Sequence, residues 1–201
     1  MDFDLKTPLF FFRHGETFYN AEGRIQGRLD TPLSPLGRRQ AGEVGGKLAA
    51  ALADHGLAPD AAEWFSSPLS RASESMELAR EAMGMPVDGF SHDDRLTELS
   101  FGAWQNLTWP EIGAAYPAGV AAREKDFWNF RPPDGESYAD LSMRVAAFLG
   151  ELPGPAIVAA HGGVARALMV LIGGLRPAKA RLAPAHQGRL LVFAGGRGRW
   201  R

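Results

Sequence analysis

The chain has 201 residues, of which 45% are hydrophobic and 22% are charged, a balance typical of a folded globular protein. It contains no cysteine, which excludes disulfides, thiolate catalysis and Cys-based metal sites. Its formal net charge of −1 argues against a nucleic acid partner. The acidic start Met1–Asp4 lacks the features of a signal peptide, and no apolar stretch is long enough to span a membrane. We therefore expect a single cytoplasmic domain over residues 1–201 that binds neither nucleic acid nor membranes.

The first expected strand, Leu9–Phe12, ends abruptly in Arg13-His14-Gly15. A buried strand would place the cation and the imidazole at its carboxyl end, which is where ligands bind in an open α/β sheet. The glycine allows the chain to turn sharply and to approach a bound group. The following stretch, residues 17–31, is a loop rich in Gly, Asn and Arg, and loops of this length are often functional.

Residues 34–90 predict two helices and two strands. Ser34 followed by Pro35 indicates an N-cap and a first helical residue, apolar residues then recur every four positions, and Gly56 is a suitable stop. The next expected elements are a strand at Ala62–Phe65, a helix at Leu69–Met83 and a weak strand at Val87–Phe90. Arg71 lies in the first turn of the second helix, close to the carboxyl end of the preceding strand.

Residues 91–133 differ in character, since they are rich in aromatic residues and show few clean periods. We interpret them as an insertion packed over the sheet edge, with a short helix at Trp109–Ala115. Most of the aromatic side chains in it are expected to be packing residues. Ser137, with Asp140 three residues later, resembles a capping box and predicts a helix that continues through Leu149.

The last part of the chain predicts a strand, a helix and a further strand, at Ala156–Ala160, Val164–Leu171 and Leu190–Ala194. The first of these strands is continuously apolar, as expected at the centre of a parallel sheet, and it ends in His161-Gly162-Gly163. Residues 195–201 indicate a turn and a frayed end. The alternation of strands and helices is typical of an α/β fold with a parallel sheet covered on both sides.

Polar residues at the expected strand ends form an inventory suited to phosphoryl transfer. A neutral imidazole, His14 or His161, can attack phosphorus and hold the phosphoryl group covalently. The guanidinium groups of Arg13 and Arg71 match phosphate oxygens and stay charged, and a second imidazolium adds a donor. A carboxylic acid such as Glu98 can protonate the departing alkoxide and later deprotonate the attacking water.

Two other chemistries fit less well. The histidines are not at the helical spacing of a metal site, and each is followed by glycine rather than by a second ligand. A Gly-x-Ser-x-Gly elbow of a serine hydrolase is absent. We therefore expect neither a metal nor a cofactor.

The motifs resemble those of the histidine phosphatase superfamily, also called phosphoglycerate-mutase-like, in their order along the chain. The similarity extends from Phe11 to about Gly174. The segments that carry it are Arg13-His14-Gly15-Glu16-Thr17 with Asn20, Gln26-Gly27, Ser66-Ser67-Pro68-Leu69-Ser70-Arg71-Ala72, Glu98 with Phe101 and Trp104, Asp134-Gly135-Glu136-Ser137 and His161-Gly162-Gly163. Several such motifs in register are far more specific than any one of them.

By this resemblance, His14 is the phosphohistidine nucleophile and Glu98 is the acid/base, while Arg13, Arg71 and His161 form the phosphate pocket. The substrate-binding set that it implies is Arg13, Thr17, Asn20, Gln26, Gly27, Arg71, His161 and Gly162. The implied fold is a three-layer α/β/α sandwich around a mostly parallel sheet, with the partly helical insertion over the active-site edge. The implied activity is that of a metal-independent phosphomonoesterase acting on a small phosphorylated metabolite.

The chain departs from the family pattern in two places. Gln105-Asn106 stands where many members have Glu-Gly, and His186-Gln187 stands where an asparagine is common. These departures affect expected substrate contacts rather than the core chemistry.

Two alternatives to the phosphatase remain open from the sequence. One is a cofactor-dependent phosphoglycerate-type mutase, which keeps the phosphoryl group and returns it to an acceptor. The other is a non-catalytic module that binds phosphoesters. The insertion at residues 91–133 contains few cations, among them Arg123, Lys125 and Arg131. It therefore offers little positive charge for a second phosphate, which favours the hydrolase.

Overall fold

The computed structural model describes residues 6–201, so the acidic start Met1–Asp4 lies outside the described residues. Within this range, six strands form one sheet in the order β3-β2-β4-β1-β5-β6. The strands are β1 Leu9–Arg13, β2 Glu63–Ser66, β3 Ser91–His92, β4 Ala156–Ala160, β5 Leu190–Ala194 and β6 Arg197–Trp200. Strands β3, β2, β4 and β1 run parallel, β5 is antiparallel to β1, and β6 is antiparallel to β5. The expected mostly parallel sheet is confirmed.

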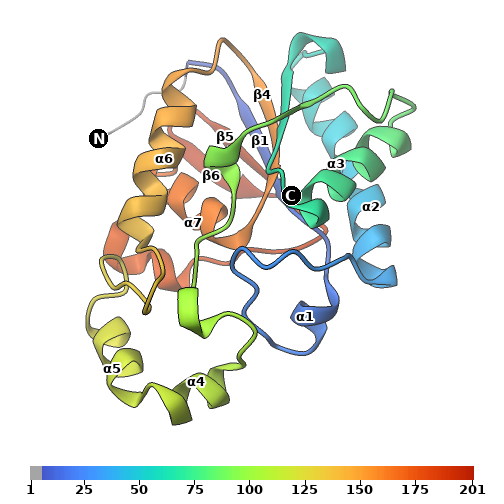
Figure 1. Cartoon of the computed structure of the whole chain (residues 1–201). Coiled ribbons are helices and arrows are strands. Elements are labelled where there is room, and N and C mark those ends of the chain that lie inside the picture. Colours follow the sequence, from blue (N-terminus) through green and yellow to red (C-terminus); the bar gives the residue numbers. More distant parts are fainter. Residues whose placement is uncertain (1–5) are drawn as a thin grey trace.

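Helices cover both faces of the sheet, which gives the three expected layers (Figure 1). On one face lie α2 and α3, which span Pro35–Asp54 and Ser70–Ala82, and on the other lie α6 and α7, which span Tyr138–Gly150 and Gly162–Leu171. The pleat of β1 divides its side chains between the two cores. Phe10 and Phe12 pack toward α2 and α3, whereas Phe11 packs toward α6 and α7.

The predicted N-terminal caps of α2 and α6 are present. The Ser34 side chain accepts the Gly37 N–H at 3.0 Å at the start of α2. Ser137 and Asp140 form the expected capping box at the start of α6. Capping side chains satisfy N–H groups that have no partner within the helix, so these short polar signals set where each helix begins.

Three short helices lie beyond the carboxyl ends of the parallel strands (Figure 1), namely α1 Phe18–Ala21, α4 Trp109–Ala115 and α5 Pro117–Lys125. Helix α4 has the predicted bounds. Helix α1 lies in the stretch that we expected to be a loop, and α5 was not predicted. Further 3-10 helices are found at Pro59–Ala61, Asp94–Leu96, Gly102–Trp104 and Pro177–Leu182. In the part of the chain that the structure describes, no helix combines the length and apolar character needed to cross a bilayer.

Two predictions of secondary structure are wrong. The weak strand expected at Val87–Phe90 is displaced to β3, because the turn-forming Asp88-Gly89 interrupts that stretch. Residues 195–201 do not fray. Gly195 and Gly196 both have positive φ, which is the geometry of a tight hairpin, and they lead into β6.

Candidate active site

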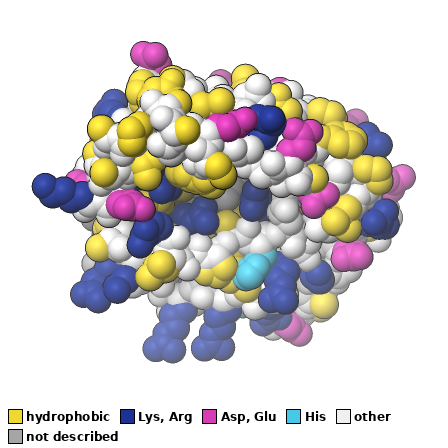
Figure 2. All heavy atoms as spheres, turned by 90° about the horizontal axis from the view of Figure 1, so that it is seen from below, with side chains coloured by type: hydrophobic (Ala, Val, Ile, Leu, Met, Phe, Trp, Pro, Cys, Tyr) yellow, Lys and Arg dark blue, Asp and Glu magenta, His cyan; other side chains and the backbone are white. Residues whose placement is uncertain are grey.

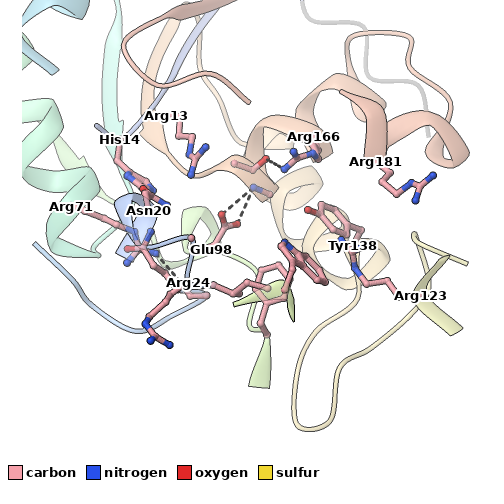
Figure 3. A pocket seen from close by; sticks show the side chains of 18 of the residues that line it. Arg13, His14, Asn20, Arg24, Arg71, Glu98, Arg123, Tyr138, Arg166 and Arg181 are labelled. Atoms are coloured by element: carbon pink, nitrogen blue, oxygen red, sulfur yellow. Dashed lines mark hydrogen bonds between the residues drawn. The ribbon is translucent and has the colours of Figure 1, made fainter. Parts of the chain in front are cut away.

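A cavity of about 400 Å³ opens beyond the carboxyl ends of the parallel strands. Figure 2 views this side of the molecule and shows basic side chains in and around a hollow. Figure 3 shows that the lining residues form two ends with Glu98 between them. At one end lie Arg13, His14, Asn20 and Arg71, and at the other lie Arg123, Tyr138, Arg166 and Arg181.

His14 follows β1 and is 2% exposed. Its Nδ1 lies 2.7 Å from the Gly15 carbonyl oxygen. Because a carbonyl can only accept, Nδ1 carries the ring proton and Nε2 keeps its lone pair. The peptide turns closely against α2, since a Cβ on Gly15 would overlap the Gly37 backbone. The close turn at this glycine and its carbonyl therefore fix the orientation of the imidazole.

The environment keeps the His14 ring neutral. Burial lowers its pKa well below 6.5, and the positive charges of Arg13 and Arg71 lower it further. A neutral imidazole with a free Nε2 is the form that can act as a nucleophile.

A buried arginine, Arg71, and a partly buried one, Arg13, flank this histidine. Arg71, in the first turn of α3, donates to the carbonyl oxygens of Gly27 and Leu29, both at 2.7 Å. Arg13 donates to the Ala185 carbonyl at 2.9 Å, and its Nε has no hydrogen-bond partner among the described residues. Burial lowers the pKa of Arg71 to about 10 and also lowers the pKa of Arg13, so both remain cationic near neutral pH. Together they provide the positive charge that a phosphate group requires.

Glu98 approaches the pocket from the segment between two 3-10 helices. Its carboxylate accepts the Gly163 N–H at 3.1 Å and the Leu99 N–H at 2.8 Å. The Gly163 amide is one of the unpaired donors at the start of α7, where a carboxylate is favoured. These contacts hold the Glu98 carboxylate between the two ends of the cavity.

Arg144 of α6 holds the segment that carries this carboxylate. Its guanidinium donates to the carbonyl oxygens of Arg95 and Thr97 at 2.7 Å and to that of Glu98 at 3.1 Å. It also contacts the Glu136 carboxylate at 3.2 Å. The position of the Glu98 carboxylate thus depends on α6.

His161 is fully buried at the end of β4, and its ring centroid lies 5.2 Å from that of His14. Nε2 is 2.8 Å from Ser67 Oγ, and Nδ1 has no partner among the described residues. Burial lowers its pKa well below 6.5, and Arg71 and His14 add to this effect. Burial therefore favours the neutral ring in the free protein, whereas the sequence analysis expected an imidazolium donor.

The remaining predicted binding residues divide into two groups. Asn20, Gln26, Gly27 and Gly162 line the cavity. Thr17 and His161 do not line it. Thr17 is fully buried and caps α1, where its side chain accepts the Asn20 N–H at 3.1 Å and so holds Asn20 in place. His161 is fully buried behind the lining residue Gly162 and beside His14.

The two departures from the family pattern also have defined places. The Gln105 side chain accepts the Arg28 N–H at 2.8 Å and packs against Gly27. It thus supports the loop that contains Gly27, near the end of the cavity where His14 and Arg71 lie. Gln187 donates to the Asn20 side chain at 2.8 Å. His186 instead packs against Trp200, with ring centroids 5.1 Å apart.

Sequence reasoning missed three residues at the far end of the cavity, namely Tyr138, Arg166 and Arg181. The count of cations in the insertion included Arg123 but not Arg166 or Arg181, because these two come from α7 and from the 3-10 helix Pro177–Leu182. A helical signal for Arg166 was present, since it lies four residues after Gly162 and so shares its face. No comparable pattern points to Arg181. Among residues 6–201, no three His, Cys, Asp or Glu side chains gather as metal binding would require.

Known proteins share both the sequence pattern and the fold. Residues 9–201 match the family described as "Histidine phosphatase superfamily (branch 1)". A "Glucosyl-3-phosphoglycerate phosphatase" from Mycolicibacterium vanbaalenii is 37% identical over 182 residues, which cover 83% of this chain and 74% of the relative. A "2,3-bisphosphoglycerate-dependent phosphoglycerate mutase 2" from Gloeobacter violaceus is 30% identical over 176 residues, 84% of this chain and 77% of that protein.

A solved structure agrees with these relatives. The mycobacterial glucosyl-3-phosphoglycerate phosphatase in complex with VO3 has a TM-score of 0.77 and 31% identity to this chain, and the match covers 97% of this chain and 96% of the other. The higher identity to the phosphatases favours the expected hydrolase over the mutase. The expected enzyme class is confirmed, and this chain belongs to branch 1 of the histidine phosphatase superfamily.

Proposed function

We propose that this chain, acting as one domain, hydrolyses phosphomonoesters of small metabolites through a phosphohistidine on His14. One observation carries the proposal. The Gly15 carbonyl fixes the His14 proton on Nδ1, so a free Nε2 lone pair faces a pocket lined by the buried Arg71 and the partly buried Arg13. Such metabolites are abundant in the cytoplasm, where we also place the protein.

In the first step, Nε2 of His14 attacks phosphorus while the bond between phosphorus and the ester oxygen breaks. Arg13 and Arg71 stabilise the charge on the equatorial phosphoryl oxygens. Glu98, in its protonated form, gives its proton to the departing oxygen, so that an alcohol leaves rather than an alkoxide. The products are the phosphohistidine and the free alcohol.

In the second step, a water molecule attacks the phosphohistidine. The Glu98 carboxylate, which has just lost its proton, takes one from that water. The P–N bond breaks, the electron pair returns to Nε2, and inorganic phosphate leaves. The protonation states of both residues are then those at the start of the cycle.

Trapping the intermediate tests this assignment. Rapid acid-free quenching after mixing with a labelled phosphoester should leave base-stable, acid-labile label on the protein. The His14→Ala variant should carry no label, while the control His92→Ala, at an exposed histidine outside the pocket, should label normally. Label that persists in His14→Ala removes this residue as nucleophile.

The far end of the cavity supports a narrower class of substrate. Arg123, Arg166 and Arg181 line it together with Tyr138, and no carboxylate forms an ion pair with these arginines among the described residues. Burial lowers the pKa of Arg123, and the charges of Arg166 and Arg181 contribute to this effect. Three close cations without an anionic partner favour a substrate with a second negative group. Phosphoglycerates, which the names of the phosphatase relatives contain, carry a carboxylate besides the phosphate and belong to this class.

A matched pair of substrates tests the second negative group. 3-Phosphoglycerate and glycerol 3-phosphate differ at one end of the molecule, where the former has a carboxylate and the latter a hydroxymethyl group. We expect kcat/KM for 3-phosphoglycerate to be higher by about tenfold, because one charge-assisted contact is worth roughly this much. Arg181→Gln should reduce the preference, whereas Arg176→Gln, at an exposed residue outside the cavity, should retain it. Equal rates for both compounds in the wild type would contradict this substrate class.

A further inference from the structure

The two ring nitrogens of His161 have different surroundings. Nε2 lies 2.8 Å from Ser67 Oγ, which follows the end of β2. Nδ1 is buried and has no hydrogen-bond partner among the described residues. Because the ring lies beside His14, Nδ1 is the polar atom of His161 that remains for a group bound there.

The surroundings of Ser67 give its hydrogen bond a direction. Its oxygen already accepts the Leu69 N–H at 3.3 Å. The hydroxyl proton needs an acceptor, and His161 Nε2 is the one that the structure provides among residues 6–201. A serine hydroxyl that donates to Nε2 requires the lone pair on that atom, so a neutral ring carries its proton on Nδ1.

We propose that Ser67 is a positioning residue that fixes His161 as the Nδ1–H tautomer, so that the buried ring donates a hydrogen bond to a phosphoryl oxygen. The inference rests on the proposed function, because it places that oxygen on a phosphoryl group bound at His14. With the other tautomer, a lone pair would face an anionic oxygen and repel it. A donor that is oriented before the substrate arrives needs no reorganisation during the reaction.

The two histidines then have the same tautomer but opposite roles. The Gly15 carbonyl holds the proton of His14 on Nδ1 and leaves Nε2 free to attack. Ser67 occupies Nε2 of His161 and leaves the Nδ1 proton free to donate. One backbone carbonyl and one serine hydroxyl therefore distinguish the nucleophile from the donor.

Nitrogen-15 NMR of the imidazole rings tests the tautomer without relying on activity. In the wild type at neutral pH, we expect His161 to be neutral with Nδ1 protonated, and the Nδ1–H resonance to shift when inorganic phosphate is added. Ser67→Ala should lose this bias between the tautomers. The matched control is Ser66→Ala, because Ser66 is equally buried but donates to a backbone carbonyl. A neutral ring protonated on Nε2 in the wild type overturns the proposal, as does an Nδ1-protonated ring that Ser67→Ala leaves unchanged.

Kinetics with p-nitrophenyl phosphate provide a second, independent readout. Loss of one neutral hydrogen bond should lower kcat/KM of Ser67→Ala by about tenfold, whereas Ser66→Ala should stay close to the wild type. His161→Asn places an amide N–H near the position of Nδ1, and His161→Gln places one near Nε2, so we expect Asn to retain more activity than Gln. The reverse order contradicts the proposed donor. If the wild type forms no phosphohistidine, the proposed function fails, while NMR still decides the tautomer.

Discussion

Replacing Glu98 with glutamine removes the proton that the carboxyl group would give to the leaving group and leaves its shape almost unchanged. The carboxylate accepts hydrogen bonds from the Gly163 and Leu99 N–H groups, and the amide oxygen of glutamine can keep one of them. The expected loss is one net hydrogen bond, which corresponds to about 1 kcal/mol of the free energy of unfolding. Since this is a small part of the stability of a domain, the variant should fold.

The catalytic effect should depend strongly on the leaving group. General acid catalysis contributes about 10²–10⁴-fold when the departing oxygen is a poor leaving group. An alkoxide therefore needs the Glu98 proton, whereas a nitrophenolate is stable without it. We expect Glu98→Gln to slow the phosphorylation of His14 by alkyl phosphates at least about a hundredfold more than phosphorylation by p-nitrophenyl phosphate.

Single-turnover rapid-quench measurements with both kinds of ester isolate the phosphorylation step. The variant should also accumulate phosphohistidine with p-nitrophenyl phosphate, because the same carboxylate must activate water in the second step. Glu124→Gln, at an exposed residue outside the cavity, is the control for removing a negative charge. Equal losses on the two leaving groups would refute the assignment of Glu98 as the acid.

Three further predictions address the metal, the acceptor and the pH. Chelation with EDTA should leave the rate largely intact, because Arg13 and Arg71 supply the positive charge; a loss that a divalent ion restores would contradict this. With 3-phosphoglycerate and catalytic 2,3-bisphosphoglycerate, free phosphate should accumulate without a comparable amount of 2-phosphoglycerate, whereas fast isomerisation would establish a mutase. Because the pKa values of His14 and His161 are well below 6.5 in the folded state, their contribution to stability is complete above that pH and is lost as the pH falls below it. In urea unfolding, the free energy of unfolding should fall by up to about 1.4 kcal/mol per ring for each pH unit below pH 6.5. His14→Gln should reduce the slope of this free energy against pH, and an unchanged slope would contradict an origin in the buried histidines.

The phosphate end of the site could be predicted from sequence because local signals determine it. His14 and His161 each follow a continuous apolar strand and precede glycine, and parallel strands bring their carboxyl ends to one edge. Arg71 lies in the first turn of α3, the helix that follows β2. The family motifs predict roles for these residues, and those roles stay predictions that the experiments above test.

The far end of the cavity could not be predicted in this way, since it depends on how distant segments pack. Arg181 comes from a 3-10 helix between α7 and β5, and Arg123 comes from a short helix without a buried face. Strand β6 also depends on its neighbour. Its sequence, with alternating arginines, is typical of a solvent-exposed tail. It forms a strand because the turn at Gly195 and Gly196 brings it beside β5. Tertiary contacts rather than local propensity determine these elements.

The hydrogen bonds from Arg144 to the carbonyl oxygens of residues 95, 97 and 98 fix Glu98 independently of the segment that follows it. That following segment could therefore be exchanged without moving Glu98. The residues around His14 are held by the sheet, and Glu98 is held by α6. Phe101, Trp109 and Phe127 line another part of the cavity, and they belong to a segment that begins just after Glu98. A chimaera that replaced residues 101–133 with the equivalent segment of another phosphatase would exchange this wall. Arg144 would still hold Glu98 beside His14. New substrate ranges could therefore arise in this scaffold by recombination of one surface segment, without rebuilding the machinery that transfers the phosphoryl group.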